Sequence, residues 1–311
     1  MQFFTILGPT ASGKTDLSIN LAKYAREKYS TEVEIISLDS ALVYKYMDIG
    51  TAKPDKEQQQ GIKHHLIDII NPTQNYNVGT FLQDVFNIVK NKQKTLPIIV
   101  GGTMLYYNAL VKGLHNIPSQ NQNIRQQIIN EAQIYGWEYM YKKLLNIDAK
   151  ANYIQANDTQ RIQRALEIYC ITNQPPSYFY EQIRSSPYTF HTIALNPNRE
   201  ILHINIKNRF NTMLEKGFLK EVEKILKQYP SLNENFSSIR CVGYRQAYQY
   251  LNNQIDYNEF VDRGIIATRQ LAKRQITWLR KLDVINIDVE DNLKFEKVKQ
   301  EFDIYYAKNL L

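Results

Sequence analysis

The residues best suited to chemistry form a glycine-rich loop near the start of the chain. Residues 8–15, called the phosphate loop below, read GPTASGKT, a glycine followed after four residues by Gly-Lys-Thr. The backbone N–H groups of such a loop bind phosphate oxygens together with the start of the helix that follows. Lys14 adds a positive charge, and the Thr15 hydroxyl is placed to ligate a magnesium ion that bridges to phosphate. The pattern predicts a phosphate site without saying whose phosphate is held.

Asp39 is the second residue placed to do chemistry. It ends an apolar run, EVEIISL at 32–38, that reads as a buried strand. Because the carboxyl ends of parallel strands open onto one crevice, Asp39 should face the phosphate loop. Its carboxylate is a candidate general base beside a phosphorylated substrate, and a magnesium ligand or a helix cap are the alternatives. The strand LPIIVGG at 96–102 ends in glycines, whereas a motor ATPase needs an acid there to hold magnesium.

A sheet of parallel strands must position these residues. Apolar runs that read as strands alternate with helical segments, which indicates a parallel sheet covered on both faces. The segment 39–54 has almost no regular period and reads as a binding loop beside the crevice. The strands are expected at 3–8, 32–39, 64–70, 96–102 and 188–197, and the helices from Lys14, at 77–94 behind an Asn77 cap, at 103–113 and from Arg199 onward.

A helical insertion interrupts this core. After Gly113 the sequence turns polar, and from about 123 to 183 it reads almost entirely as helix. We therefore expect an α/β fold with a P-loop parallel-sheet core, covered by helices, at 1–114 and 188–311. The helical insertion domain is expected at 115–187.

Composition excludes several classes of protein. The chain has 311 residues, 43% of them hydrophobic, but no run approaches the roughly 18 apolar residues of a membrane span. No signal-peptide pattern opens it. The two cysteines, Cys170 and Cys241, form neither a CxxC pair nor a metal-binding spacing, and the five histidines indicate no metal site. We expect a cytoplasmic monomer without membrane attachment.

Positive charge gathers toward the end of the chain. Lys and Arg total 38 and Asp and Glu 31, so the net charge is +7. Residues 240–281 hold eight basic residues and three acidic ones, a local excess of +5. This excess favours a polyanion such as nucleic acid as the partner, although a solvated helix face would carry the same charges.

Five stretches, in order along the chain, resemble the tRNA dimethylallyltransferase family, also called tRNA isopentenyltransferases. They are GPTASGKT at 8–15, DSALVYKYMDIGTAKP at 39–54, VGGTMLYYNAL at 100–110, SIRCVGYRQ at 238–246 and ATRQLAKRQITWLR at 267–280. The resemblance implies transfer of the five-carbon group of dimethylallyl diphosphate to N6 of adenosine 37, in the anticodon stem-loop of tRNA, with release of diphosphate. The loop would then hold the leaving group of the substrate, with Mg²⁺, and ATP would not be hydrolysed.

The resemblance also assigns roles to residues. Asp39 would be the general base, and Arg209 would face the diphosphate, although a surface arginine on a long helix is the alternative for Arg209. Family members often carry a second arginine four residues earlier, where this chain has Asn205. The catalytic residues are then Asp39, Lys14, Thr15 and Arg209, the metal ligand is Thr15, and the diphosphate-binding residues are Gly8, Thr10, Ala11, Ser12, Gly13, Lys14 and Thr15.

The same resemblance places tRNA on three basic stretches and on the crevice. In 267–280 a basic stripe lies opposite Ala272, Ile276 and Leu279, which suits a phosphate backbone. Thr103 is expected to contact the target nucleotide, to cap the helix that follows it, or to do both. The predicted tRNA-binding residues are Asp39, Ser40, Ala41, Leu42, Thr103, Arg125, Gln160, Arg161, Arg164, Arg240, Gly243, Arg245, Arg269, Lys273, Arg274 and Arg280.

Three other functions share parts of the pattern. A nucleoside or nucleotide kinase would use the loop for ATP and Asp39 as base for a hydroxyl. An adenylate prenyltransferase would share the loop and Asp39 but would lack a large RNA-binding surface. A nucleic-acid-binding ATPase would need the strand-end acid that 96–102 lacks. The excess of +5 over 240–281 favours the tRNA enzyme over the first two.

Overall fold

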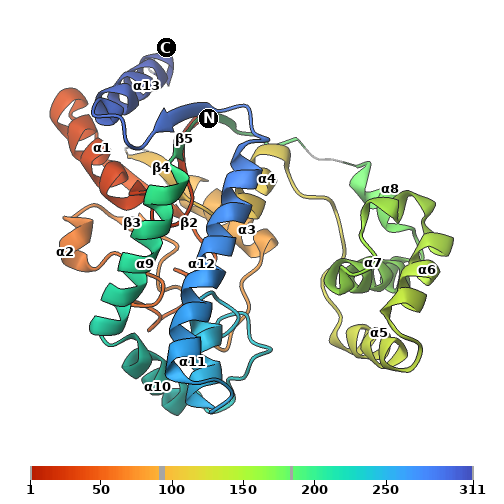
Figure 1. Ribbon diagram of the computed structural model, residues 1–311. Helices are drawn as coiled ribbons and strands as arrows, with labels where there is room; N and C mark the ends of the chain where they lie inside the picture. Colours follow the sequence, from red (N-terminus) through yellow and green to blue (C-terminus); the bar gives the residue numbers. More distant parts are fainter. Residues whose placement is uncertain (1, 91–94, 183–184, 310–311) are drawn as a thin grey trace. The chain divides into compact units, whose positions relative to one another are not determined.

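The computed structural model describes residues 2–90, 95–182 and 185–309. The chain forms two compact units, one made of Met1–Val111 with Pro187–Leu311 and the other of Lys112–Ser186 (Figure 1). The second unit starts three residues before the predicted insertion and ends one residue before its end. Among the described residues, no helix combines the length and apolar character needed to cross a membrane.

The first unit is built on a parallel sheet of six strands in the order β3-β2-β4-β1-β5-β6. Leu7, Leu38 and Gly101 lie at the carboxyl ends of adjacent strands, which therefore finish at one edge of the sheet. The chain segments that follow these ends carry the phosphate loop, Asp39 and Thr103. The strands are β1 Gln2–Leu7, β2 Val33–Leu38, β3 His64–His65, β4 Leu96–Gly101, β5 Thr189–Asn196 and β6 Ile285–Asp288.

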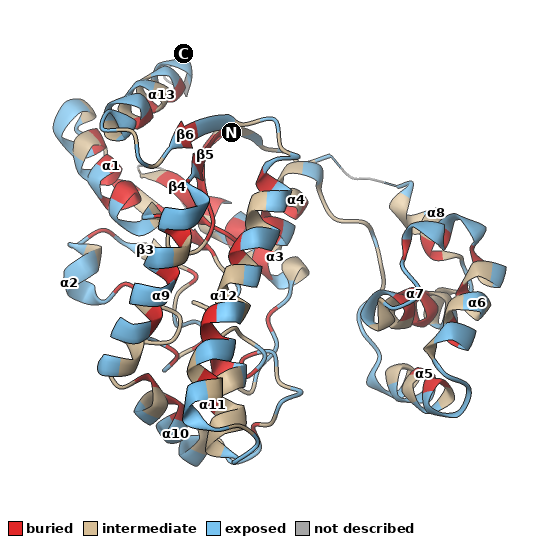
Figure 2. Ribbon diagram, viewed as in Figure 1, coloured by how far each residue is buried: buried red, intermediate tan, exposed pale blue. Residues whose placement is uncertain are grey.

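Helices cover both faces of the sheet because its central strands are apolar on both sides. Figure 2 shows the buried residues of these strands and of the helices that cover them. In β1, Phe4 and Ile6 pack toward α1 and α13, while Phe3 and Leu7 pack toward the remaining large helices. The helices of this unit are α1 Lys14–Tyr29, α2 Lys56–Gln59, α3 Val78–Lys90, α4 Met104–Lys112, α9 Arg199–Glu215, α10 Phe218–Gln228, α11 Tyr244–Leu251, α12 Tyr257–Leu279 and α13 Lys294–Asn309.

The second unit is helical and has its own core. Residues from three of its helices, including Ile128, Met140 and Ile162, are buried against one another. The Asp158 side chain caps α7 by accepting a hydrogen bond from the N–H of Arg161. The helices are α5 Gln122–Tyr135, α6 Trp137–Ile147, α7 Thr159–Thr172 and α8 Pro176–Tyr180, with a 3-10 turn, η1, at Ala149–Tyr153.

Two predicted elements differ from the structure. The third strand, expected at 64–70, is only His64–His65, because Leu66 and Asp68 have positive φ angles of 63° and 56° that turn the chain out of the sheet. The region after Arg199 is not helical throughout, since β6 adds an edge strand at Ile285–Asp288.

Two other predicted helical ends fall on residues that the structure does not describe. The helix capped by Asn77 is confirmed as α3, and the end predicted at 91–94 lies outside the described residues. Residue 183, where the helical region was expected to end, lies outside them as well.

Candidate active site

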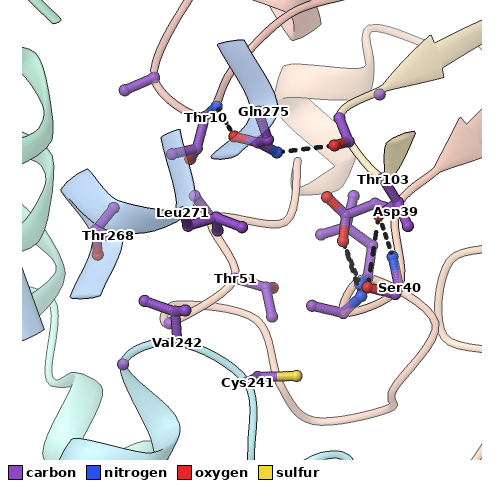
Figure 3. A pocket seen from close by; sticks show the side chains of 18 of the residues that line it. Thr10, Asp39, Ser40, Thr51, Thr103, Cys241, Val242, Thr268, Leu271 and Gln275 are labelled. Carbon is purple, nitrogen blue, oxygen red and sulfur yellow. Dashed lines mark hydrogen bonds between the residues drawn. The ribbon is translucent and has the colours of Figure 1, made fainter. Parts of the chain in front are cut away.

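A cavity of about 580 Å³ lies at the carboxyl ends of the sheet strands in the first unit (Figure 3). Its walls come from the phosphate loop, the ends of β2 and β4, α9, the segment before α11, and α12. Of the residues predicted to be catalytic, Lys14, Thr15, Asp39 and Arg209 all line it. The structure therefore brings together the four side chains that sequence reasoning grouped.

The phosphate loop is held in a tight turn around one carbonyl. The Pro9 carbonyl accepts hydrogen bonds from Ser12 Oγ at 2.8 Å and from Lys14 Nζ at 2.6 Å. Gly13 has a φ of 81° and directly precedes α1, so the first turn of that helix opens at the loop. The N–H groups of a first helical turn have no partners within the helix, which makes this end suited to an anion.

Lys14, Arg209 and Asp39 influence one another at the cavity. The pKa of Lys14 is lowered to about 7, chiefly by burial and also by the nearby charge of Arg209, while the charge of Asp39 acts in the opposite direction. Burial also lowers the pKa of Arg209, while Asp39 raises it. Two desolvated cations thus face one carboxylate, and an anionic ligand would relieve the repulsion between them.

Asp39 has one carboxylate oxygen fixed and the other open. Its Oδ1 accepts hydrogen bonds from the N–H groups of Ala41 at 2.8 Å and Leu42 at 3.3 Å. No described residue donates a hydrogen bond to Oδ2. The carboxylate therefore caps a turn of its own loop and not a helix. An oriented carboxylate with one accessible oxygen is the arrangement that a general base requires.

Thr103 supports the same loop. Its Oγ1 accepts a hydrogen bond from the N–H of Ser40 at 3.1 Å. The backbone carbonyl of Thr103 accepts from the N–H groups of Tyr106 and Tyr107 at the start of α4. The side chain thus joins the ends of β2 and β4, whereas the carbonyl of Thr103 accepts the first hydrogen bonds of α4.

Arg209 contacts a loop that is held by a half-buried carboxylate, Glu221, which the sequence did not reveal. Its Nη2 reaches the Thr51 carbonyl at 3.4 Å. The segment before Thr51 is held by Glu221 on α10, which accepts hydrogen bonds from the N–H groups of residues 48–50 and from the Tyr244 hydroxyl. A single glutamate on an amphipathic helix carries no distinguishing pattern, so only the fold could identify Glu221.

Gly50 is required for this close packing, and we expect Gly50→Ala to be strongly disruptive. A Cβ there would lie 2.1 Å from a ring carbon of Phe218 and 2.7 Å from the ring of Tyr244. Overpacking of this kind typically costs about 1–3 kcal/mol. Urea unfolding of the variant should show a loss in that range, with reduced activity in the remaining folded protein. A free energy of unfolding within about 0.5 kcal/mol of the unmodified chain would contradict the packing described here.

The predicted tRNA-binding residues of the first unit fall into two groups. One group lines the cavity: Asp39, Ser40, Ala41, Leu42, Thr103, Arg240, Gly243 and Arg274. In the other, Lys273 on α12 and Arg280 directly after it are exposed, and Arg245 lines a second hollow of about 390 Å³, which Arg240 also borders. Arg269 is half-buried, and its Nε has no hydrogen-bond partner in the described structure. Ala272 and Leu279 are buried, as the predicted stripe requires.

The basic residues of the second unit are partly engaged within it. Gln160 and Arg161 are exposed on α7. Arg125 and Arg164 both pair with Glu167, whose side chain is fully buried. These two arginines therefore also neutralise an internal carboxylate. Of the three arginines, Arg161 is the most exposed.

Asn205 lies one turn before Arg209 on α9 and is exposed. It is not among the described residues that line the cavity, whereas Ile206, Arg209 and Phe210 are. Sequence reasoning also named no role for Gln275, although the side chain of this residue joins the phosphate loop to the end of β4.

Comparison with known proteins identifies the family of this chain. A family model described as IPP transferase matches residues 42–282. The chain is 46% identical over 284 residues to a tRNA dimethylallyltransferase of Neisseria meningitidis serogroup C (strain 053442), covering 89% of each chain. It is 44% identical over 295 residues to that of Chromobacterium violaceum, covering 93% of this chain and 89% of the relative.

A solved structure shows the same architecture. The full-length tRNA isopentenylpyrophosphate transferase of Bacillus halodurans is 32% identical, with a TM-score of 0.66 over 99% of this chain and 96% of that one. The chain therefore belongs to the IPP transferase family, together with the tRNA dimethylallyltransferases, and is a prenyltransferase.

Proposed function

We propose that this enzyme transfers the dimethylallyl group of dimethylallyl diphosphate to N6 of adenosine 37 in tRNA and releases diphosphate. The observation that carries the proposal is that one cavity is lined by Asp39, with its open oxygen, and by Lys14 and Arg209. A donor diphosphate beside the two cations would bring its allylic carbon into the space that Asp39 also borders.

The reaction needs two kinds of assistance. The bond between the allylic carbon and a diphosphate oxygen breaks, while a bond forms between that carbon and N6. Negative charge grows on the departing diphosphate, and Lys14, Arg209 and the start of α1 are positioned to neutralise it. N6 must also lose a proton, which the open oxygen of Asp39 accepts. The negative charge of Asp39 further favours the electron-poor allylic group. The residues proposed to hold the diphosphate are Gly8, Thr10, Ala11, Ser12, Gly13, Lys14 and Thr15.

A magnesium ion fits the donor set beside the loop. The Thr15 hydroxyl and the Asp39 carboxylate both border the cavity and offer hard oxygen ligands. Magnesium commonly takes one or two protein oxygens and completes its shell with substrate phosphates and water. The described residues hold no cluster of three or more His, Cys, Asp or Glu side chains that could bind a metal without the substrate. We propose that Thr15 ligates the ion, which would neutralise part of the negative charge of the diphosphate.

The target adenine must leave its stack to reach Asp39. The cavity is recessed at the strand ends, and a base stacked within an anticodon loop would present N6 too far from it. We propose that the nucleotide flips into the cavity, as base-modifying enzymes commonly require. The segment 39–42, Thr103 and Arg240 border the space that it would enter.

We expect the exposed face of α12 to contact tRNA phosphates. The double variant Lys273→Ala/Arg280→Ala should weaken tRNA binding and reduce the salt slope by about one unit for each lost contact. Filter binding across a salt series measures both. Lys23→Ala/Lys308→Ala removes two exposed charges from α1 and α13, on the opposite face of the sheet, and should leave the slope unchanged. Equal slopes for both double variants would mean that α12 carries only solvated charges.

One assay separates the proposed function from its alternatives. The protein is incubated with labelled dimethylallyl diphosphate, labelled ATP, AMP and unmodified tRNA. We expect the prenyl label in tRNA alone, with ATP intact. Label on AMP would indicate an adenylate prenyltransferase, phosphate transfer a kinase, and RNA-stimulated ATP hydrolysis a nucleic-acid-binding ATPase. Each of these three results would contradict the proposal.

A further inference from the structure

Gln275 on α12 is a polar side chain in the cavity that the proposed function leaves without a role. Its Oε1 accepts a hydrogen bond from the N–H of Thr10 at 2.8 Å. Its Nε2 donates to the carbonyl of Gly102 at 2.9 Å. Figure 3 shows the amide between the two partners. Gln275 thus ties the phosphate loop to the end of β4.

The glycines at the end of β4 make room for this contact. A Cβ on Gly102 would lie 2.5 Å from Nε2 of Gln275 and 2.9 Å from the carbonyl oxygen of Gly8. A Cβ on Gly101 would lie 2.1 Å from the carbonyl oxygen of Leu38. The glycine pair that replaces a strand-end acid therefore lets β4, the phosphate loop and α12 meet closely.

The bond to Thr10 fixes the orientation of one peptide plane. In a trans peptide the N–H and the preceding C=O point in opposite directions. Because Gln275 holds the N–H of Thr10, the carbonyl of Pro9 is turned to the other side. That carbonyl accepts hydrogen bonds from Ser12 Oγ and Lys14 Nζ. The amide of Gln275 is thus linked to the ammonium of Lys14 through a single rigid peptide.

We propose that Gln275 is a positioning residue for the diphosphate site, which holds the Pro9–Thr10 peptide in one orientation and thereby places Lys14. The inference rests on the proposed function, since it assumes that the loop binds diphosphate. Glutamine suits this place because its amide supplies an acceptor for Thr10 and a donor for Gly102 at once. Methionine, of similar length, supplies neither, and an ionised glutamate can only accept.

The test compares Gln275→Met and Gln275→Glu with the unmodified enzyme. We expect Gln275→Met to weaken binding of inorganic diphosphate, and to raise KM for dimethylallyl diphosphate, by about tenfold, in line with the loss of two hydrogen bonds. Gln275→Glu should bind diphosphate still more weakly, because its negative charge lies beside the anion and its carboxylate repels the carbonyl oxygen of Gly102. The Kd for tRNA and the melting temperature should change little. Gln300→Glu adds the same charge at an exposed position of α13, on the opposite face of the sheet, and should behave as the unmodified enzyme.

Two results would overturn this inference. One is unchanged diphosphate binding in both Gln275 variants. The other is an equal loss of diphosphate and tRNA binding together with a lower melting temperature, which would mean that Gln275 only packs α12. If the unmodified enzyme did not bind diphosphate, the proposed function and this inference would both be wrong. That result is distinct from the two above, because it is obtained with the unmodified enzyme alone.

Discussion

Asp39→Asn should abolish most prenyl transfer while leaving tRNA bound. A single general base typically contributes about 10²–10⁴-fold, and the loss should appear in kcat under saturating substrates. Asparagine keeps an oxygen that can accept the hydrogen bonds from Ala41 and Leu42, so the turn should persist. What it loses is the ability to accept the N6 proton. Single-turnover transfer and filter binding, measured side by side, separate the two effects.

The matched control for this variant is Asp262→Asn. Asp262 is an exposed carboxylate on α12, outside the cavity, so its substitution removes the same charge from the same unit. It should leave transfer unchanged. Turnover of Asp39→Asn within a few-fold of the unmodified enzyme would remove Asp39 from the role of base.

Lys14→Met should weaken binding of dimethylallyl diphosphate and flatten its dependence on pH. The pKa of Lys14 is lowered to about 7, chiefly by burial. Below that pH the ammonium is already charged and its contribution to diphosphate affinity is constant. As pH rises above about 7, binding must take up a proton, and affinity should fall by up to about tenfold per unit. The variant, without the charge, should bind about 10- to 100-fold more weakly at pH 6, the loss expected for a hydrogen bond to a charged group.

Calorimetric Kd values between pH 6 and 9 test this account of Lys14. Titration of the diphosphate itself affects the enzyme and the variant alike, so the ratio of the two Kd values isolates the lysine. The Kd of the variant divided by the Kd of the unmodified enzyme should fall as the pH rises. A constant ratio, or a variant that loses tRNA affinity while keeping diphosphate affinity, would show that Lys14 does not meet the leaving group.

The sheet could be predicted wherever a strand is buried on both faces. β1, β2 and β4 are continuous apolar runs, and glycine or aspartate marks their ends, so pattern alone locates them. β6 was not predicted, because its four residues, INID, form an exposed edge strand with only one buried side chain. β3 was predicted too long because HHLIDII is apolar enough for a strand, and the left-handed turns at Leu66 and Asp68 are not visible in residue type.

The site divides in the same way. Lys14, Thr15 and Asp39 follow strand ends, and parallel strands bring such positions together whatever lies between them. Gln275 and Glu221 act through contacts with residues 265 and about 170 positions away, and neither residue type is distinctive on a helix. Their roles depend on where α12 and α10 pack, which single-sequence patterns do not specify. Buried Glu167 likewise explains why two predicted RNA-binding arginines also face inward.

The central claim is that the phosphate loop holds a leaving group whose departure prenylates one adenine. The most direct measurement counts released diphosphate and maps the modified nucleoside by mass spectrometry in one single-turnover reaction with an anticodon stem-loop RNA. We expect one diphosphate for each prenyl group, carried on N6 of adenosine 37 and absent when that adenosine is replaced by guanosine. Diphosphate release without transfer, or a prenyl group at another position, would contradict the account.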